Sequence, residues 1–376
     1  MAWIAKRQTK SGVRYDLRYR VGDDVAREVF RRRVDVENRR KIVEADELRG
    51  VLVNPARSRI TLADWWDQWW PTTANLREST RERDEIYWSS RIEPRFGSVR
   101  LDRIHSEDLQ AWIAELLADG LAPSTVHKAV QILAKPLRAA VRHGRLQSNP
   151  AEGLELPRVE REEMRFLTPS EVDDLAEVID PRYRALIYVG AYGGLRLGEM
   201  LALRYERVDL AHARLDVATT LVEVRGKLTE NAPKTRAGRR SVPIPRVAVE
   251  ALEKHFAACP GSRTSHVFTG AEGGTVRARN WRRREWAAAV RAVGLEPLRP
   301  HDLRHTAVAF WIAAGASPNE VAARAGHRSV VTVLDRYGHL LPGSEDRVNA
   351  ALDELAAPSA RHEERATVTE LRARGV

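Results

Sequence analysis

From Thr61 onward, the sequence is divided into short segments by residues that begin or end helices. Thr61 is expected to cap the helix that begins with the next apolar run, and Ser124 to cap a later helix that stops at Gly144. Thr168–Glu171 and Ser317–Glu320 have the spacing of a capping box, in which a hydroxyl and a carboxylate three residues apart satisfy each other's backbone N–H groups. This pattern predicts a mainly helical chain made of many short helices.

Residues 1–59 follow a different pattern. Between Gly12 and Gly22, aromatic and apolar residues alternate with charged ones, which is the periodicity of a strand bounded by turns. The following segment is rich in helix formers and stops at Gly50. We therefore expect a small three-stranded antiparallel sheet and one helix. These residues hold 16 Lys and Arg against 9 Asp and Glu, so they contribute +7 of the chain's net charge of +10.

Composition narrows the class of protein. The chain has 376 residues, enough for two or three domains, and no apolar run long enough to span a membrane. Its N-terminus lacks the pattern of a secretory signal, and Cys259 is the only cysteine, which excludes an internal disulfide and a cysteine-based zinc site. These features fit a cytoplasmic protein. The net charge of +10 favours an anionic polymer, most simply a nucleic acid, as the partner.

Tryptophans are concentrated at the start of the first helical region. Trp65 and Trp69, like Trp66 and Trp70, are one helical turn apart. Aromatic rings can stack on bases, but at this spacing we expect them to form a hydrophobic core.

Polar residues of a particular kind are collected between residues 299 and 340, among short apolar segments. They are His301, Arg304, His305, His327, Arg328, Arg336, Tyr337 and His339. The spacing of His301 and His305 also occurs in zinc sites, but no glutamate lies between them and Arg304 would repel a cation. We therefore expect no metal site here.

The order of five motifs carries a resemblance. GGLRLGE, a PKT in a hairpin, HDLRHT, AGHRS and DRYGHL follow one another along residues 165–341. In this order they resemble the tyrosine recombinase, or phage integrase, family. The helical middle of the chain resembles the SAM-like core-binding domain of that family, and the basic N-terminal segment resembles its arm-binding domain.

The resemblance implies a set of site residues. Arg196 and Arg304 would bind the scissile phosphate, whose transition state gathers negative charge on the non-bridging oxygens. Tyr337 would attack and form a 3′-phosphotyrosine bond. The remaining members are His301 as acceptor of the tyrosine proton, His327 as donor to a phosphate oxygen, Lys234 as acid for the leaving 5′ oxygen, and Glu199 and His305 as supporting residues. Lys227, in the same hairpin, is the alternative to Lys234. No cofactor or metal ion is implied.

The implied fold is multidomain and mainly α. We expect an arm-type DNA-binding domain at 1–59, a helical core-binding domain at 60–150, a linker at 151–164, a catalytic domain with a small antiparallel sheet at 165–343, and a tail at 344–376. Val348, Ala351, Leu352 and Leu355 would form an apolar stripe on a tail helix, which packs either on its own domain or on a neighbouring protomer.

The implied function is site-specific DNA recombination for the integration or excision of a phage or mobile element. The expected partners are double-stranded DNA with core and arm-type attachment sites, three further copies of the chain in a tetramer, and accessory DNA-bending or directionality factors. A nucleoid association would follow from DNA binding. The alternatives are a chromosome-dimer resolvase, a type IB topoisomerase, a non-catalytic DNA-binding protein of the same fold, and an RNA-binding protein.

Overall fold

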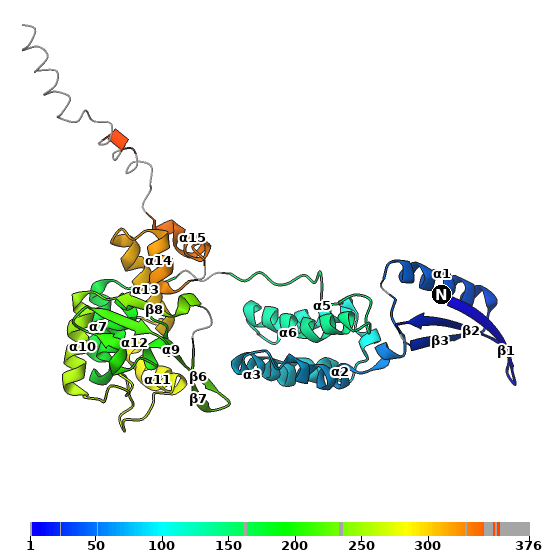
Figure 1. The fold of residues 1–376 in the computed structure, drawn as a ribbon, viewed down its shortest axis with the longest axis horizontal. Coiled ribbons are helices and arrows are strands. Elements are labelled where there is room, and N and C mark those ends of the chain that lie inside the picture. The colour runs from blue at the N-terminus through cyan, green and yellow to red at the C-terminus, as the bar shows by residue number, and fades with distance from the viewer. Residues whose placement is uncertain are drawn as a thin grey trace, which may run out of the picture. The chain divides into compact units, whose positions relative to one another are not determined.

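A computed structural model describes residues 2–22, 24–50, 52–160, 164–232, 236–327, 329–341, 349 and 352–353 (Figure 1). The chain divides into two compact units, Met1–Glu162 and Glu163–Val376. Lys234 and nearly all of the expected tail helix lie outside the described residues.

The first unit begins with an antiparallel sheet of three strands in the order β1-β2-β3. The strands are Ala2–Thr9 (β1), Gly12–Val21 (β2) and Asp24–Phe30 (β3), and the helix Arg33–Leu48 (α1) follows them. Leu17 and Tyr19 of β2 are buried together with Val36 and Val43 of α1, so one face of the sheet packs on the helix. The predicted sheet and helix are confirmed.

The rest of the first unit is helical. Its helices are Leu62–Trp69 (α2), Glu78–Tyr87 (α3), Glu93–Phe96 (α4), Ser106–Ala118 (α5) and Pro123–Arg142 (α6). Thr61 caps α2, since its hydroxyl accepts the Asp64 N–H at 3.1 Å. The expectation that Ser124 caps α6 is wrong, because Pro123 is already the first helical residue. Proline fits that position because its missing N–H would have no partner there.

The tryptophans of α2 lie in the core, as expected. The ring of Trp66 is stacked between Trp70, at 4.5 Å between centroids, and Trp88, at 4.2 Å. The indole N–H of Trp65 donates to the carbonyl of Pro136 on α6 at 2.8 Å. The rings of Trp65, Trp66 and Trp69 in α2, and of Trp70 directly after it, are all buried, so they are not available to stack on bases.

We predict that Trp66→Ala will destabilise the first unit by about 3–5 kcal/mol, because it removes a buried ring and both of its stacking partners' contacts. Ile86→Ala in α3, where the side chain is 57% exposed, should change stability by less than about 0.5 kcal/mol. Denaturant unfolding followed by tryptophan fluorescence measures both. Equal effects of the two substitutions would contradict this assignment of the core.

In its described residues, the second unit consists of short helices and two small antiparallel sheets. Its helices are Pro169–Val178 (α7), Arg184–Gly193 (α8), Leu197–Leu201 (α9), Arg246–Ala258 (α10), Ala278–Trp281 (α11), Ala287–Ala292 (α12), Pro300–Ala313 (α13), Pro318–Ala325 (α14) and Val331–Tyr337 (α15). Its strands are Val208–Asp209 (β4), Arg214–Val217 (β5), Thr220–Val224 (β6), Lys227–Asn231 (β7) and Arg240–Pro243 (β8).

The expected single sheet of this region is divided in the described residues. Strands β4, β5 and β8 form one antiparallel sheet, and β6 and β7 form a separate hairpin. The cause is visible in the pairing, since β5 pairs with β8 rather than with the neighbouring β6. The segment between β5 and β8 therefore leaves the sheet, forms its own hairpin and returns.

Helices α8 and α13 cross closely in the core of the second unit. A Cβ at Gly190 would lie 2.8 Å from Leu303, and one at Gly194 would lie 2.5 Å from the ring of Trp311. Gly194 also ends α8 in the left-handed conformation, with φ of 64°. Both glycines thus allow α13 to lie directly against the end of α8. The predicted capping boxes at Thr168 and Ser317 are both present.

Among the described ranges, no helix combines the length and the apolar character needed to cross a membrane.

Candidate active site

Five elements of the second unit bring the candidate residues together. Arg196 and Glu199 lie at the start of α9, Arg240 on β8, and His301, Arg304 and His305 on α13. His327 follows the end of α14, and Tyr337 is the last residue of α15.

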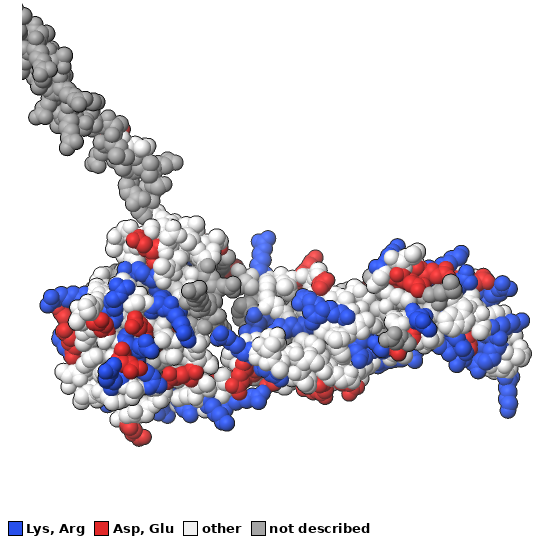
Figure 2. All heavy atoms as spheres, in the orientation of Figure 1, with Lys and Arg blue, Asp and Glu red and all other residues white. Residues whose placement is uncertain are grey.

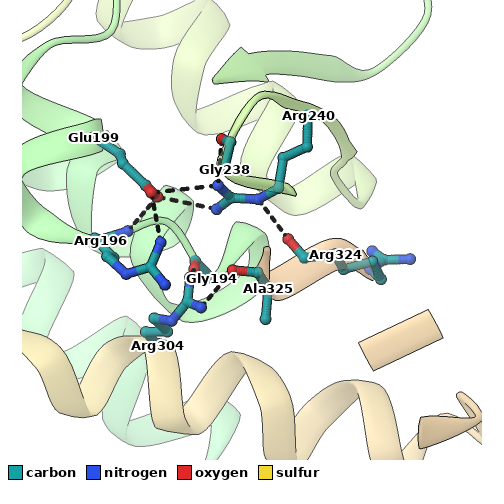
Figure 3. A network of polar contacts seen from close by, with 8 residues as sticks. All are labelled: Gly194, Arg196, Glu199, Gly238, Arg240, Arg304, Arg324 and Ala325. Atoms are coloured by element: carbon teal, nitrogen blue, oxygen red, sulfur yellow. Dashed lines mark hydrogen bonds and ion pairs between the residues drawn. The ribbon is translucent and has the colours of Figure 1, made fainter. Parts of the chain in front are cut away.

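A buried carboxylate organises one side of the site (Figure 3). Glu199 is 5% exposed and accepts the backbone N–H of Arg196 at 2.9 Å and its Nη1–H at 2.8 Å. It also accepts from Arg240, at 3.3 Å on Oε1 and 3.0 Å on Oε2. Burial alone would raise the pKa of Glu199. Arg240, and after it Arg196, lower the pKa by more than burial raises it, so the net pKa lies below the ordinary value. Glu199 is therefore ionised between two guanidinium groups.

Arg304 is held by two backbone carbonyls. Its guanidinium is 2% exposed and donates from Nη1 to the carbonyl of Gly194 at 2.6 Å and from Nη2 to the carbonyl of Ala325. These carbonyls belong to the C-terminal ends of α8 and α14, which carry partial negative charge. Desolvation and then the charge of Arg196 lower the pKa of Arg304 to about 9. Arg304 consequently remains charged at neutral pH.

Tyr337 is buried and contacts His305 rather than His301. The two side chains form a hydrogen bond of 2.5 Å between the tyrosine Oη and Nδ1 of His305, and Tyr337 is 2% exposed. The ring of His301 stands edge-on to that of His305, with centroids 4.8 Å apart. His305, expected only to support the site, is thus the histidine next to the expected nucleophile.

All three histidines of the site have lowered pKa values. Desolvation and then neighbouring positive side chains lower the pKa of His327 to about 4, and desolvation and then His301 lower that of His305 to about 4. Desolvation, then Arg304 and Arg196, lower that of His301 as well. The rings are neutral near pH 7, so Nδ1 of His305 can accept the tyrosine hydroxyl's proton in the hydrogen bond. Burial raises the pKa of Tyr337, while Arg304 and Arg336 act in the opposite direction.

The remaining residues that the sequence singled out differ in their burial and in their contacts. His327 has a buried Nδ1 for which the described part of the chain supplies no hydrogen-bond partner. Arg336 acts electrostatically on Tyr337 and on the site histidines. His339 lies beside Phe166, with ring centroids 6.4 Å apart. Lys227 is exposed at the start of β7.

Arg240 is the residue of this site that sequence reasoning missed. It stands in the run GRRSVP, where alternation of exposed and buried residues marks a strand, and nothing in that run singles out one of its arginines. Its role is visible only in the fold, because Glu199 and α14 come from distant parts of the sequence.

The arrangement can bind a phosphate. The side chain of Arg196 is 42% exposed and Arg304 is buried beside it, since the charge of Arg196 lowers the pKa of Arg304. Planar guanidinium forks match the oxygens of a phosphodiester, and Arg196 is the one of these arginines that solvent reaches. In the residues that the structure describes, no group of three or more His, Cys, Asp or Glu could hold a metal ion.

We predict that the protein loses stability as the pH falls from about 6.5 toward 4. Histidines with lowered pKa stay neutral in the folded state, whereas the unfolded chain binds protons in this range, so acid favours unfolding. Melting temperature against pH measures the effect. In a His305→Gln, His327→Gln double variant, the melting temperature should fall less steeply with pH than in the wild type. His212→Gln, at the surface, should show the same slope as the wild type. An unchanged slope in the double variant would contradict the burial of these rings.

Comparison with known proteins identifies two segments of the chain that match one family. Residues 165–343 match the family model described as the phage integrase family, and residues 61–117 match that of the phage integrase N-terminal SAM-like domain. Together the two matched segments cover more than half of the chain.

Individual relatives are similar over most of their length. The ICEBs1 integrase of Bacillus subtilis is 28% identical, over 68% of this chain and 72% of the relative. The integrase of Mycobacterium phage L5 is 26% identical, over 81% of this chain and 82% of the relative. Among solved structures, the Tn1549 transposon integrase in complex with a circular intermediate DNA has a TM-score of 0.67 at 19% identity, over 79% of this chain and 99% of that one. This last likeness concerns the fold.

Proposed function

The chain belongs to the phage integrase family of tyrosine recombinases, and we propose that Tyr337 is the residue with which it cleaves and rejoins DNA strands. It is a site-specific recombinase that serves the integration or excision of a phage or other mobile element, and it acts as a DNA strand transferase. The observation that carries the assignment of Tyr337 is its hydroxyl, 2.5 Å from Nδ1 of His305 and within the electrostatic reach of Arg304.

The proposed reaction is a transesterification. The oxygen of Tyr337 attacks the scissile phosphorus, a bond from phosphorus to the tyrosine oxygen forms, and the bond to the 5′ oxygen breaks. Arg196 and Arg304 bind the non-bridging oxygens, where charge accumulates, and His327 donates to one of them. Lys234 protonates the departing 5′ oxygen. A 5′ hydroxyl of a second strand then attacks the phosphotyrosine, which restores the tyrosine and the phosphodiester.

Two histidines can take the proton that Tyr337 loses. His301 is the residue implied by the family pattern, and it lies one helical turn from Arg304. His305 is the residue in hydrogen-bond contact with the hydroxyl before DNA is bound. We assign His305 to holding the hydroxyl in the resting protein and His301 to accepting the proton beside the phosphate, because His301 is exposed to solvent and His305 is buried.

The N-terminal sheet supports a second proposed DNA contact. Tyr15, Leu17 and Tyr19 face α1, so the alternating residues of β2 and their partners face away from the helix. That outer face carries Arg7, Arg14, Arg18, Arg20 and Arg27. Figure 2 shows Lys and Arg side chains over the strands and a group of Asp and Glu side chains over α1. We propose that this face binds the phosphates of arm-type sites.

The proposed assembly is a tetramer on two DNA duplexes, assisted by DNA-bending or directionality factors. We propose the domains of the sequence analysis as its functional parts, with 1–59 on arm sites and 60–150 with 165–343 on the core site. A chromosome-dimer resolvase would use the same chemistry, and the basic N-terminal module favours an integrase over it. A non-catalytic role is disfavoured by the presence of Arg196, His301, Arg304, His327 and Tyr337 in one site.

We predict that Tyr337→Phe will bind its core site with unchanged affinity and form no covalent adduct with a nicked suicide substrate, because the attacking oxygen is missing. Denaturing gel electrophoresis of the protein–DNA mixture measures the adduct. The matched control is Tyr205→Phe, which removes a hydroxyl that binds the carbonyl of Cys259 away from the site and should leave the adduct yield unchanged. An adduct in Tyr337→Phe would assign the nucleophile to another residue.

We predict that Arg18→Gln with Arg20→Gln will weaken binding to duplex DNA and reduce the slope of log Kd against log salt by up to about 2, since each lost phosphate contact removes roughly 0.9 from the slope. Arg33→Gln with Arg40→Gln, on α1, removes the same charge from the other side of the module and should change the slope less. Equal changes in the two pairs would mean that total charge, and not the sheet face, sets the affinity.

A further inference from the structure

We propose that Arg240 is a positioning residue for strand cleavage, which fixes the phosphate-binding Arg196 and the segment of His327 relative to each other. This inference rests on the proposed function of the site. It concerns a residue that belongs to none of the motifs that carry the family resemblance.

The side chain of Arg240 is committed entirely to protein contacts. It is 7% exposed, and its guanidinium reaches three different segments of the second unit (Figure 3). It donates to both carboxylate oxygens of Glu199 at 3.0 and 3.3 Å, to the carbonyl of Arg324 at 2.7 Å and to that of Gly238 at 3.2 Å. A guanidinium with this many buried partners is a structural junction rather than a surface contact for DNA.

The first connection sets the direction of Arg196. Glu199 holds the guanidinium of Arg196 through a single hydrogen bond of 2.8 Å to Nη1. The carboxylate can do so only if it stays ionised and does not rotate, and Arg240 supplies both conditions from the opposite side. Its charge lowers the pKa of Glu199 against the effect of burial, and its two donors fix the plane of the carboxylate.

The second connection sets the path of the chain into His327. Arg240 and Arg304 bind adjacent carbonyls at the end of α14, those of Arg324 and Ala325. Gly326 follows in the left-handed conformation, and a Cβ there would lie 2.9 Å from the carbonyl of Ala237 and 3.1 Å from Nη1 of Arg240. The chain therefore leaves α14 in close contact with the segment before β8. His327 is the next residue.

Both connections need the shape of a guanidinium. A lysine ammonium keeps the charge, but it is a single point and cannot meet Glu199 and the Arg324 carbonyl with separate, rigidly spaced donors. Methionine fills a similar volume and offers neither charge nor donor. Arg240→Lys and Arg240→Met thus separate the contribution of charge from that of geometry.

The experiment measures single-turnover cleavage of a nicked suicide duplex at saturating protein, beside single-site DNA affinity and melting temperature. For Arg240→Met we expect about a hundredfold slower cleavage with DNA affinity within about threefold of the wild type, because small misplacements of catalytic groups cost rates of this order. Arg240→Lys should recover part of the rate. Arg214→Met, which removes an exposed arginine bound to Ser241 in the same sheet, is the matched control and should cleave normally.

A substrate with an uncharged scissile group distinguishes the positioning of Arg196 from a merely structural role, which would slow cleavage of both substrates equally. If Arg240 aligns Arg196 on the charged oxygens, the loss in Arg240→Met should be much smaller on a duplex with a methylphosphonate at the scissile position. Glu199→Gln combined with Arg240→Met should also cleave no more slowly than the worse single variant, since both act through one linkage.

The inference is overturned if Arg240→Met cleaves normally. It is also overturned if the rate falls equally on the charged and neutral substrates, or if the losses of Arg240→Met and Glu199→Gln are fully additive. If the wild type itself forms no adduct at Tyr337, the proposed function fails instead. If Arg240→Met does not fold, Arg240→Lys carries the same comparison of substrates.

Discussion

The site depends on a carboxylate that keeps positive charges together. The positive charges of Arg196, Arg240 and Arg304 repel one another, and removing Arg240 and Arg304 from water is costly. Glu199 offsets this by binding two of the guanidinium groups, and the carbonyl ends of α8 and α14 hold the third. The positive charge that a phosphodiester requires is therefore assembled before DNA arrives, and the short helices of the second unit end where their carbonyls can hold it.

The same charge governs the histidines and the tyrosine. Desolvation and the nearby arginines keep the histidine rings neutral, and a neutral His305 holds the buried hydroxyl of Tyr337. The burial that raises the pKa of Tyr337 also keeps its hydroxyl protonated and away from solvent. In the proposed reaction, a phosphate bound by Arg196 would supply negative charge that favours protonation of His301. Cleavage would then depend on the presence of DNA.

Much of this could be predicted from the sequence because it depends on local signals. Capping residues such as Thr61 and Thr168 act within one helical turn, and the motifs around Arg196, Arg304 and Tyr337 are short and follow in a fixed order. Interactions between distant segments could not be predicted in this way. Arg240 meets Glu199 across 41 residues and Arg324 across 84. The division of the expected sheet and the contact of His305 with Tyr337 likewise follow from tertiary packing, and Ser124 was misassigned because Pro123 begins the helix one residue earlier.

The central claim is that one tyrosine exchanges DNA strands through a bond to a 3′ phosphate. The most direct test is to trap the covalent complex of the wild-type protein with a suicide duplex, digest both polymers and locate the nucleotide-bearing peptide by mass spectrometry. The account predicts a single modified residue, Tyr337, joined to the 3′ phosphate, with a free 5′ hydroxyl on the released strand. A nucleotide on any other residue, or a linkage to a 5′ phosphate, would contradict it.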